Sequence, residues 1–227
     1  MAQVNIFGNI DVTGILKDYK TQIDNFYGGD PTTSNPSPSV LAKIIDPNFA
    51  PLKLGYWNIN VLPSYTRLVS SKDSTLGYEI RTGDTVTRNG KTYLTNTYNL
   101  TVMADNGDDL RWWGHSIAPN IQNQAIIANI NNPGSSTAPP PQFGTLTNSN
   151  ITFYNAAGAV NPANLMDGLN IATRSAFCIN GKLTASSGQS ISYDIDILVM
   201  SAPLTQGGSL LTYPIVKVVV DPVIIVR

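Results

Sequence analysis

His115, the single histidine of this chain, is the first residue to consider for catalysis. It precedes Ser116, so the sequence places an imidazole next to a hydroxyl. Adjacent residues rarely reach the geometry in which a histidine activates a serine, because a third group must also orient the ring. Asp108 and Asp109 lie nearby, but tight turns select aspartate for backbone reasons. We therefore predict no catalytic residues and no enzymatic activity.

Four side chains with oxygen ligands precede this histidine: Asp105, Asn106, Asp108 and Asp109. Calcium binds oxygen ligands of this kind. A turn explains the same residues more simply, so we expect no metal, and Asp105, Asp108 and Asp109 are the candidates should one bind. Zinc prefers several histidine or cysteine ligands, and the chain has one of each. We also expect no cofactor.

Trp112 and Trp113 form a second candidate site together with His115. Adjacent side chains of a strand point to opposite faces, so we expect one tryptophan in the core and the other on the outer face. The outer one is either covered by a loop, a second layer or a neighbouring subunit, or it is an exposed platform that stacks on a sugar or a partner. Trp112, Trp113 and His115 are therefore the candidate ligand-binding residues.

These residues belong to a stretch that predicts three strands. Residues 100–104 and 109–113 flank Asn106-Gly107, a strong hairpin signal, because a type I′ turn needs positive φ at both central residues. The apolar run at 124–130 predicts the third strand. Asn89-Gly90 and Asn180-Gly181 predict two further hairpins.

The chain on either side also reads mainly as strands. Residues 4–16 predict a first strand region, whereas 17–26 suit a short helix or a strand end equally well. Ser37-Pro38 predicts a helix start, since proline is favoured at the first helical position. Asn161-Pro162, closing at Gly168, predicts a second short helix. From Ile191 to Val199 apolar residues alternate with polar ones, which predicts a strand with Asp194 and Asp196 on a solvated face.

This pattern indicates an all-β protein with roughly a dozen strands and one or two short helices. We predict a two-sheet antiparallel β-sandwich of the jelly-roll or immunoglobulin-like kind, with a closed β-barrel as the alternative. Residues 1–227 are expected to form a single domain. Residues 131–142 contain four prolines, which lack the N–H that a ladder needs, so they predict a proline-rich surface loop.

Composition narrows the function classes. Charged residues make up 13% of the chain, against about 25% in typical domains, and the net charge is −1. No basic run suggests a nucleic-acid partner. A charge-poor surface has little self-repulsion and tends to associate. We find no signal peptide and no apolar run long enough to span a membrane. The single cysteine, Cys178, has apolar neighbours in the sequence, which predicts a buried, inert thiol. These features favour the cytoplasm and no membrane partner.

Three segments resemble a known family in the same order along the chain. The central one is the eleven-residue run GDDLRWWGHSI that starts at Gly107. Ile10-Asp11-Val12, with Asp18-Tyr19 after it, precedes this run, and Asp221-Pro222 opens the final strand. Together they resemble the bacterial inclusion body protein family of PixA/AidA type. The chain departs from that family's pattern at His115, where threonine is usual, at Val219 and Val220, where aromatics are usual, and at an enlarged loop over 131–150.

The resemblance implies a non-enzymatic protein that self-associates in a structural, storage or stress-related role, in cytoplasmic inclusions. Its partner would then be further copies of itself. The alternative is a carbohydrate-binding, lectin-like module that uses outward aromatics such as Trp57, Trp112 or Trp113.

Overall fold

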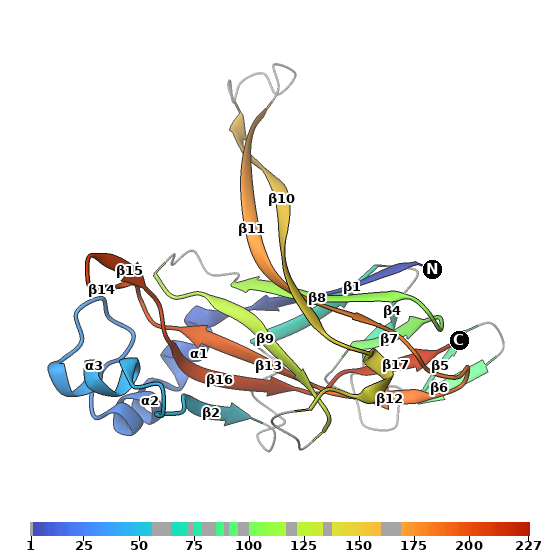
Figure 1. Ribbon diagram of the computed structural model, residues 1–227, viewed down its shortest axis with the longest axis horizontal. Coiled ribbons are helices and arrows are strands. Elements are labelled where there is room, and N and C mark those ends of the chain that lie inside the picture. Colours follow the sequence, from blue (N-terminus) through green and yellow to red (C-terminus); the bar gives the residue numbers. More distant parts are fainter. Residues whose placement is uncertain are drawn as a thin grey trace.

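Strands dominate the protein, as the patterning predicts (Figure 1). The computed structural model describes residues 2–55, 65–71, 75–78, 85–88, 91–94, 100–116, 122–133, 138–159 and 169–227. Trp57, the turn at Asn89-Gly90 and the helix expected at 161–168 lie outside these residues. The prediction of a mostly β fold is confirmed.

The largest sheet has five strands, in the order β10-β11-β8-β1-β3. Its central pair, β1 and β8, runs parallel, and the other pairs run antiparallel. The strands are β1 (Gln3–Ile10), β3 (Thr66–Ser70), β8 (Asp109–Ser116), β10 (Thr147–Ala159) and β11 (Leu169–Lys182).

Two four-stranded sheets continue into one another. Their orders are β2-β16-β13-β9 and β12-β17-β7-β4. The backbone N–H of Tyr193 donates to the carbonyl of Pro222 at 3.2 Å, between the end of β12 and the start of β17. The strands are β2 (Leu52–Gly55), β4 (Thr75–Tyr78), β7 (Leu100–Ala104), β9 (Ala125–Asn131), β12 (Ser190–Ser192), β13 (Asp194–Met200), β16 (Pro214–Val220) and β17 (Val223–Val226).

Two small hairpins complete the described strands. One pairs β5 (Thr85–Arg88) with β6 (Lys91–Leu94), and this confirms that strands flank Asn89-Gly90. The other pairs β14 (Leu204–Gln206) with β15 (Ser209–Leu211). Its tip is Gly207-Gly208, where φ values of 55° and 82° suit glycine.

The expectation of strictly antiparallel sheets is wrong. Besides β1 with β8, the pairs β2 with β16 and β7 with β17 run parallel. Parallel neighbours need a long connection, and each of these pairs joins segments that are far apart in the chain. Hairpin signals report only neighbours in sequence, so they could not show such pairs. None of the described sheets closes into a barrel, which was the alternative.

The central stretch does not form the expected hairpin. A turn is present, because the N–H of Asp108 donates to the carbonyl of Asp105 at 3.0 Å and Gly107 has φ 92°. However, β7, β8 and β9 lie in three different sheets. The turn therefore carries the chain between sheets instead of reversing it within one. Leu183 holds the turn in place through two backbone hydrogen bonds, from Gly107 at 2.8 Å and to Asp108 at 2.9 Å.

The hairpin expected at Asn180-Gly181 is also wrong, since both residues lie inside the continuous strand β11. Its partners there are β8 on one side and β10 on the other. Asparagine and glycine suit a turn, but here Gly181 allows the segment that contains Phe143 and Leu146 to lie close against β11.

Helices gather at one end of the molecule (Figure 1). They are α1 (Val12–Asp18), α2 (Lys20–Tyr27) and α3 (Pro38–Ile45). The first strand ends at Ile10 rather than 16, because Asp11 caps α1 by accepting from the N–H of Gly14 at 2.9 Å. Proline begins α3 as predicted. None of the helices in the described part of the chain has the length and apolar character that crossing a bilayer requires.

One buried cluster links the sheets and the helices. Trp112 of β8 contacts Phe143 and Tyr193, with ring centroids 5.2 and 5.9 Å apart. Phe143 lies in a short 3-10 helix, Pro141–Phe143, at the end of the proline-rich segment. That segment is joined across its base by a hydrogen bond of 2.7 Å from Asn132 N–H to the carbonyl of Ala138.

The single domain over 1–227 and the surface loop over 131–142 stay predictions.

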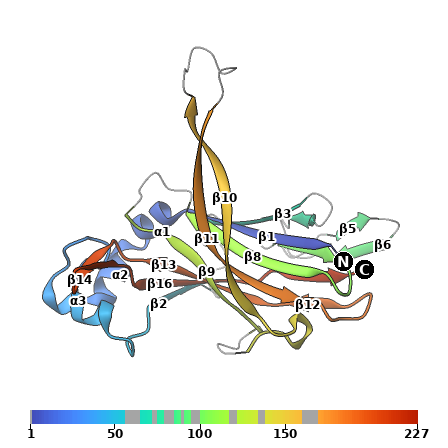
Figure 2. The same ribbon diagram turned by 45° about the horizontal axis from the view of Figure 1, so that its top comes forward.

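The strands β10 and β11 continue beyond the sheet as a two-stranded arm (Figures 1 and 2). β11 pairs with β8 only from Cys178 to Lys182. Its pairing with β10 extends from Asn180 back to Leu169. Both views show the arm standing away from the body of the molecule.

Candidate functional site

The two tryptophans point to opposite faces of β8, as predicted. Trp112 is completely buried, and its indole Nε1 donates to the hydroxyl of Tyr193 at 3.1 Å. Trp113 lies on the outer face of the five-stranded sheet and is half-buried. Trp112 is thus a core residue, and the outer face is where Trp113 and His115 meet solvent.

An aromatic row crosses the outer face. Phe7 lies opposite Trp113 in the register of β1 and β8, and their ring centroids are 4.4 Å apart. Phe7 also lies 4.9 Å from the ring of His115, whose side chain is exposed. On the other side, Cys178 of β11 lies opposite Trp113. Trp113 is therefore partly covered by its own chain, while His115 lies at the open end of the row.

Cys178 is buried, as predicted. Burial raises the pKa of its thiol, which disfavours the thiolate. The thiolate is the nucleophilic form, so the side chain is an inert part of this face.

The aspartates of the central turn have three different roles. Asp108 is buried and accepts hydrogen bonds from the N–H groups of Ala2, at 2.6 Å, and Asp105, at 2.9 Å. Asp105 is exposed and pairs with Arg227 at 3.0 Å. Asp109 is exposed at the start of β8. Within the described ranges, no group of three or more His, Cys, Asp or Glu side chains could hold a metal ion.

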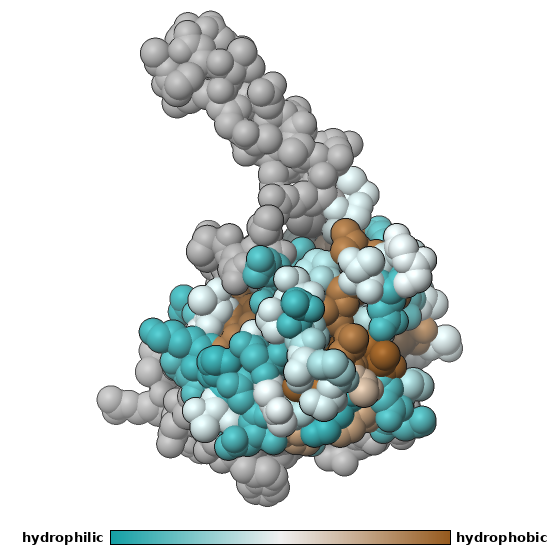
Figure 3. Space-filling view, turned by 90° about the vertical axis from the view of Figure 1, so that its left-hand side faces the viewer, coloured by the Kyte–Doolittle hydropathy of each residue, from teal (hydrophilic) through white to brown (hydrophobic). Residues whose placement is uncertain are grey.

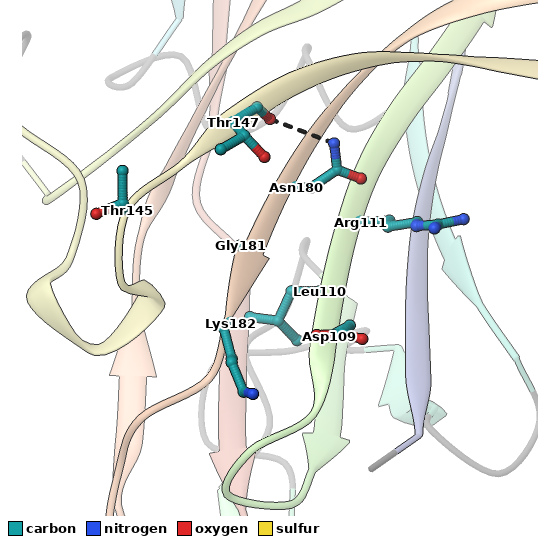
Figure 4. Close-up of a pocket in the computed structure, with 8 residues that line it drawn as sticks. All are labelled: Asp109, Leu110, Arg111, Thr145, Thr147, Asn180, Gly181 and Lys182. Atoms are coloured by element: carbon teal, nitrogen blue, oxygen red, sulfur yellow. Dashed lines mark hydrogen bonds between the residues drawn. The ribbon is translucent and has the colours of Figure 1, made fainter.

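A polar groove lies on the same outer face, at the base of the arm (Figure 4). Its volume is about 320 Å³. Three strands or their approaches supply the walls, and the lining residues are Asp109, Leu110, Arg111, Thr145, Thr147, Asn180, Gly181 and Lys182. Sequence reasoning missed this groove. Asp109 and Arg111 alternate along β8, but only the register of β8 with β11 places Lys182 opposite Asp109 and Asn180 opposite Arg111.

Gly181 allows the wall of the groove to form. A Cβ at this position would lie 2.8 Å from Cδ2 of Leu146 and 2.9 Å from the carbonyl oxygen of Phe143. Both distances are too short for a real side chain, so only glycine lets the segment before β10 lie directly against β11. Thr145 belongs to this segment and lines the groove.

Hydrogen bonds fix part of the lining. Asn180 Nδ2 donates to Ser149 Oγ at 2.9 Å and to the carbonyl of Thr147 at 3.3 Å. The guanidinium of Arg111 contacts the side-chain amide of Gln3, whose oxygen accepts from three guanidinium nitrogens at 2.9 to 3.0 Å when it faces them. Asp109 and Lys182 form no ion pair with any residue that the structure describes. The Arg111 guanidinium is thus directed toward Gln3 of β1 and away from Lys182 (Figure 4), which leaves the Lys182 ammonium and the Asp109 carboxylate as the charged groups of the groove.

A second exposed surface is apolar and lies at the helical end. Leu210 and Leu211 of β15 are 73% and 44% exposed, and Phe26 of α2 is 38% exposed. Figure 3 faces this end and shows apolar side chains at the surface among polar ones. This surface and the groove lie on different parts of the molecule.

Asp194 and Asp196 are both buried, so the predicted solvated face of β13 is wrong. Asp196 accepts from Lys217 Nζ at 2.6 Å and from Asn131 Nδ2 at 2.9 Å. These partners come from the neighbouring strands β16 and β9, and they compensate the cost of burying the charge. Asp221 lies close enough to Asp194 to feel its charge, and burial together with that charge raises the pKa of Asp221 to about 6.

A scan against models of protein families finds no match, and a search of curated proteins finds no relative. Among solved structures, the chain is similar to the inclusion body protein PixA from Burkholderia cenocepacia J2315. The two share 13% sequence identity, and the alignment covers 97% of this chain and 95% of that one, with a TM-score of 0.49. A likeness at this level carries no functional conclusion.

Proposed function

We propose that this protein is a non-enzymatic, self-associating structural protein, and that copies meet at the β10–β11 arm. The observation that carries this proposal is the open backbone edge of the arm. On the N-terminal side of Cys178, β11 pairs with β10 and with no other described strand. β10 pairs with β11 and with no other described strand. Each outer edge therefore offers a row of N–H and C=O groups to a further strand.

The arm should also be only weakly stable as an isolated pair of strands. A two-stranded ribbon in water is marginally stable, and a third strand adds hydrogen bonds and covers side chains. Pairing with another copy would supply that strand. Addition of a strand at an open edge is a common mode of recognition between proteins.

The sequence of the arm lacks the usual protection against such pairing. Edge strands are commonly blunted by lysine, proline or inward charges. β10 (Thr147–Ala159) contains no charged residue and no proline. Between Leu169 and Gly181, β11 contains a single charge, Arg174. An edge of this length and composition favours association.

Two further features support self-association. The chain is charge-poor, with a net charge of −1, so copies repel one another weakly. The exposed leucines of β15 supply a second apolar contact surface, away from the arm. Two separate contact surfaces per copy allow extended assembly rather than a closed dimer.

Asp108 does not serve His115 as the sequence allowed. The ring of His115 contacts Phe7, and Asp108 accepts hydrogen bonds from the backbone N–H groups of Ala2 and Asp105. The sequence resemblance to inclusion body proteins agrees with this proposal and suggests cytoplasmic inclusions as the assembled form.

Carbohydrate binding is the second candidate function. It is favoured by the outer aromatic row, in which Trp113 and His115 lie beside polar side chains. A glycan array with the wild-type protein and Trp113→Ala tests it. Binding that depends on Trp113 supports this function, and an empty array removes it.

Expression in a heterologous bacterial host, followed by electron microscopy, tests the main proposal. We expect dense intracellular particles that dissolve without denaturant into folded protein. Misfolded aggregates would need denaturant, so solubility and circular dichroism separate the two kinds of particle. A protein that stays dispersed at high expression level would contradict the proposal.

A further inference from the structure

The two edges of the arm are not equivalent. β10 (Thr147–Ala159) pairs with no described strand except β11, so its outer edge is open along all 13 residues. The edge of β11 is open only from Leu169 to Phe177, because β8 occupies that side from Cys178 to Lys182. Among the described strands of the arm, β10 therefore offers the longer row of backbone N–H and C=O groups to an incoming strand.

Charge separates the two edges further. β10 contains no charged residue, whereas the open part of β11 is centred on Thr173 and contains Arg174 next to that centre. Two β11 edges paired antiparallel over this part would bring the Arg174 residues of the two copies to diagonal positions across the new pair. Like charges at neighbouring cross-strand positions destabilise a sheet. A shifted register that separates the two arginines shortens an edge that is already the shorter one, so β11 edges are poor partners for one another.

We propose that two copies join through their β10 strands alone, antiparallel and about a two-fold axis, into a four-stranded sheet in the order β11-β10-β10-β11. This inference rests on the proposed association through the arm and gives it a geometry. A two-fold contact uses the same surface on both copies, so each copy occupies the open β10 edge of the other. The two outer edges of the shared sheet are then both β11, and Arg174 opposes pairing between them. The arm contact therefore closes at two copies.

Growth beyond the dimer then depends on the second contact surface. Leu210 and Leu211 of β15 are 73% and 44% exposed, at the helical end and away from the arm. Contacts between these leucines would link one arm-paired dimer to the next. Removal of either surface should therefore stop growth at two copies, and removal of both should leave monomers.

Single-cysteine variants of the full chain test the two-fold axis. Asn148→Cys, Asn150→Cys and Thr152→Cys replace exposed residues on one face of β10, and the native Cys178 is buried. In an antiparallel pair with its axis near the middle of β10, a residue comes about 14 Å closer to its own copy with each step of two residues toward the axis. The yield of dimer with a short bis-maleimide cross-linker should therefore rise from Asn148→Cys to Thr152→Cys. Equal yields at the three positions would contradict the antiparallel two-fold pairing.

Arg174→Thr tests what stops the shared sheet, and Lys53→Thr, which removes an exposed cation on β2, is the matched control. Both changes are made in a Leu210→Glu/Leu211→Glu protein, in which only the arm remains for association. Arg174→Thr should allow species larger than a dimer, whereas Lys53→Thr should not. An Arg174→Thr protein that stays dimeric would contradict the role of Arg174.

Sedimentation velocity on the Leu210→Glu/Leu211→Glu protein separates this inference from the proposed function. We expect its sedimenting mass to double as concentration rises and then to stay constant, and circular dichroism checks that it is folded. A mass that keeps growing would overturn the closed β10 pairing and leave association through the arm standing. A monomer at every concentration would contradict association through the arm itself. A dimer that persists after Asn150→Lys/Thr152→Lys is added would place the contact outside β10 and overturn the inference.

Discussion

The indole nitrogen of Trp112 donates a hydrogen bond of 3.1 Å to the hydroxyl of Tyr193, and both side chains are completely buried. The bond joins the five-stranded sheet to the segment between β12 and β13. The aromatic ring of Phe143 contacts both residues, with centroids 5.2 Å from Trp112 and 5.1 Å from Tyr193. One hydrogen bond and two aromatic contacts thus hold Trp112 in the core.

Tyr193→Phe should lower the free energy of unfolding by about 1–3 kcal/mol, because it leaves a buried N–H without its acceptor. Urea denaturation measures this difference. Tyr213→Phe is the matched control, since its hydroxyl donates to Gln206 at 3.1 Å in a half-buried position and should cost less. Equal and small effects of the two variants would show that the Trp112 bond contributes little.

Gly114 and Gly8 lie opposite each other in the parallel pair β1–β8, and they should respond differently to alanine. A Cβ at Gly114 would lie 2.7 Å from the carbonyl oxygen of Gly8, which forces the backbone to move. The three atoms nearest to a Cβ at Gly8 would be side-chain atoms of Ile127, Leu68 and Ile10, at 3.4, 3.5 and 3.9 Å.

Gly114→Ala should therefore lower the free energy of unfolding by about 1–3 kcal/mol, as overpacking does. Gly8→Ala should change it by less than about 1 kcal/mol, because the alanine also restricts the unfolded chain. Chemical denaturation of both variants tests the pair. A Gly114→Ala protein as stable as Gly8→Ala would contradict the close approach.

Asp221 should make the free energy of unfolding depend on pH between pH 3.8 and about pH 6. Burial, with the nearby charge of Asp194, raises its pKa in the folded protein from 3.8 to about 6. The folded state thus binds this proton more tightly than the unfolded state does. Its contribution to stability is complete below pH 3.8 and is lost as the pH rises through about 6.

Asp221→Asn cannot lose a proton, so the variant should gain stability relative to wild type above pH 6. The difference between the two proteins should shrink toward pH 4. Thermal unfolding of both proteins from pH 4 to pH 8 measures it, and the comparison cancels the titration of other groups. A constant difference over this range would show that Asp221 is not the group responsible.

Local patterns predicted the local features well. The alternation of side chains along a strand placed one tryptophan inside and one outside, and proline at the first helical position marked the start of α3. The apolar neighbours of Cys178 correctly indicated burial. Each of these features depends on residues that are close together in sequence.

Features that depend on distant partners could not be predicted. Asn106-Gly107 signals a turn, but the turn leads into a different sheet because β8 pairs with β1 and β11 instead of β7. The alternation along β13 predicts a solvated Asp196, because its partners Lys217 and Asn131 lie on other strands and are distant in sequence. The groove requires the register of β8 against β11, which no local pattern contains.

Sedimentation velocity on a charged arm variant tests the central proposal most directly. Asn150→Lys/Thr152→Lys adds two charges at exposed positions of β10, where they should block strand addition. Ser186→Lys/Ser187→Lys adds the same charge to an exposed loop. We expect the wild type and the loop variant to form progressively larger species as concentration rises, while the folded arm variant forms nothing larger than the dimer that its unchanged β15 surface allows. An arm variant that associates as strongly as the wild type would contradict self-association through the arm.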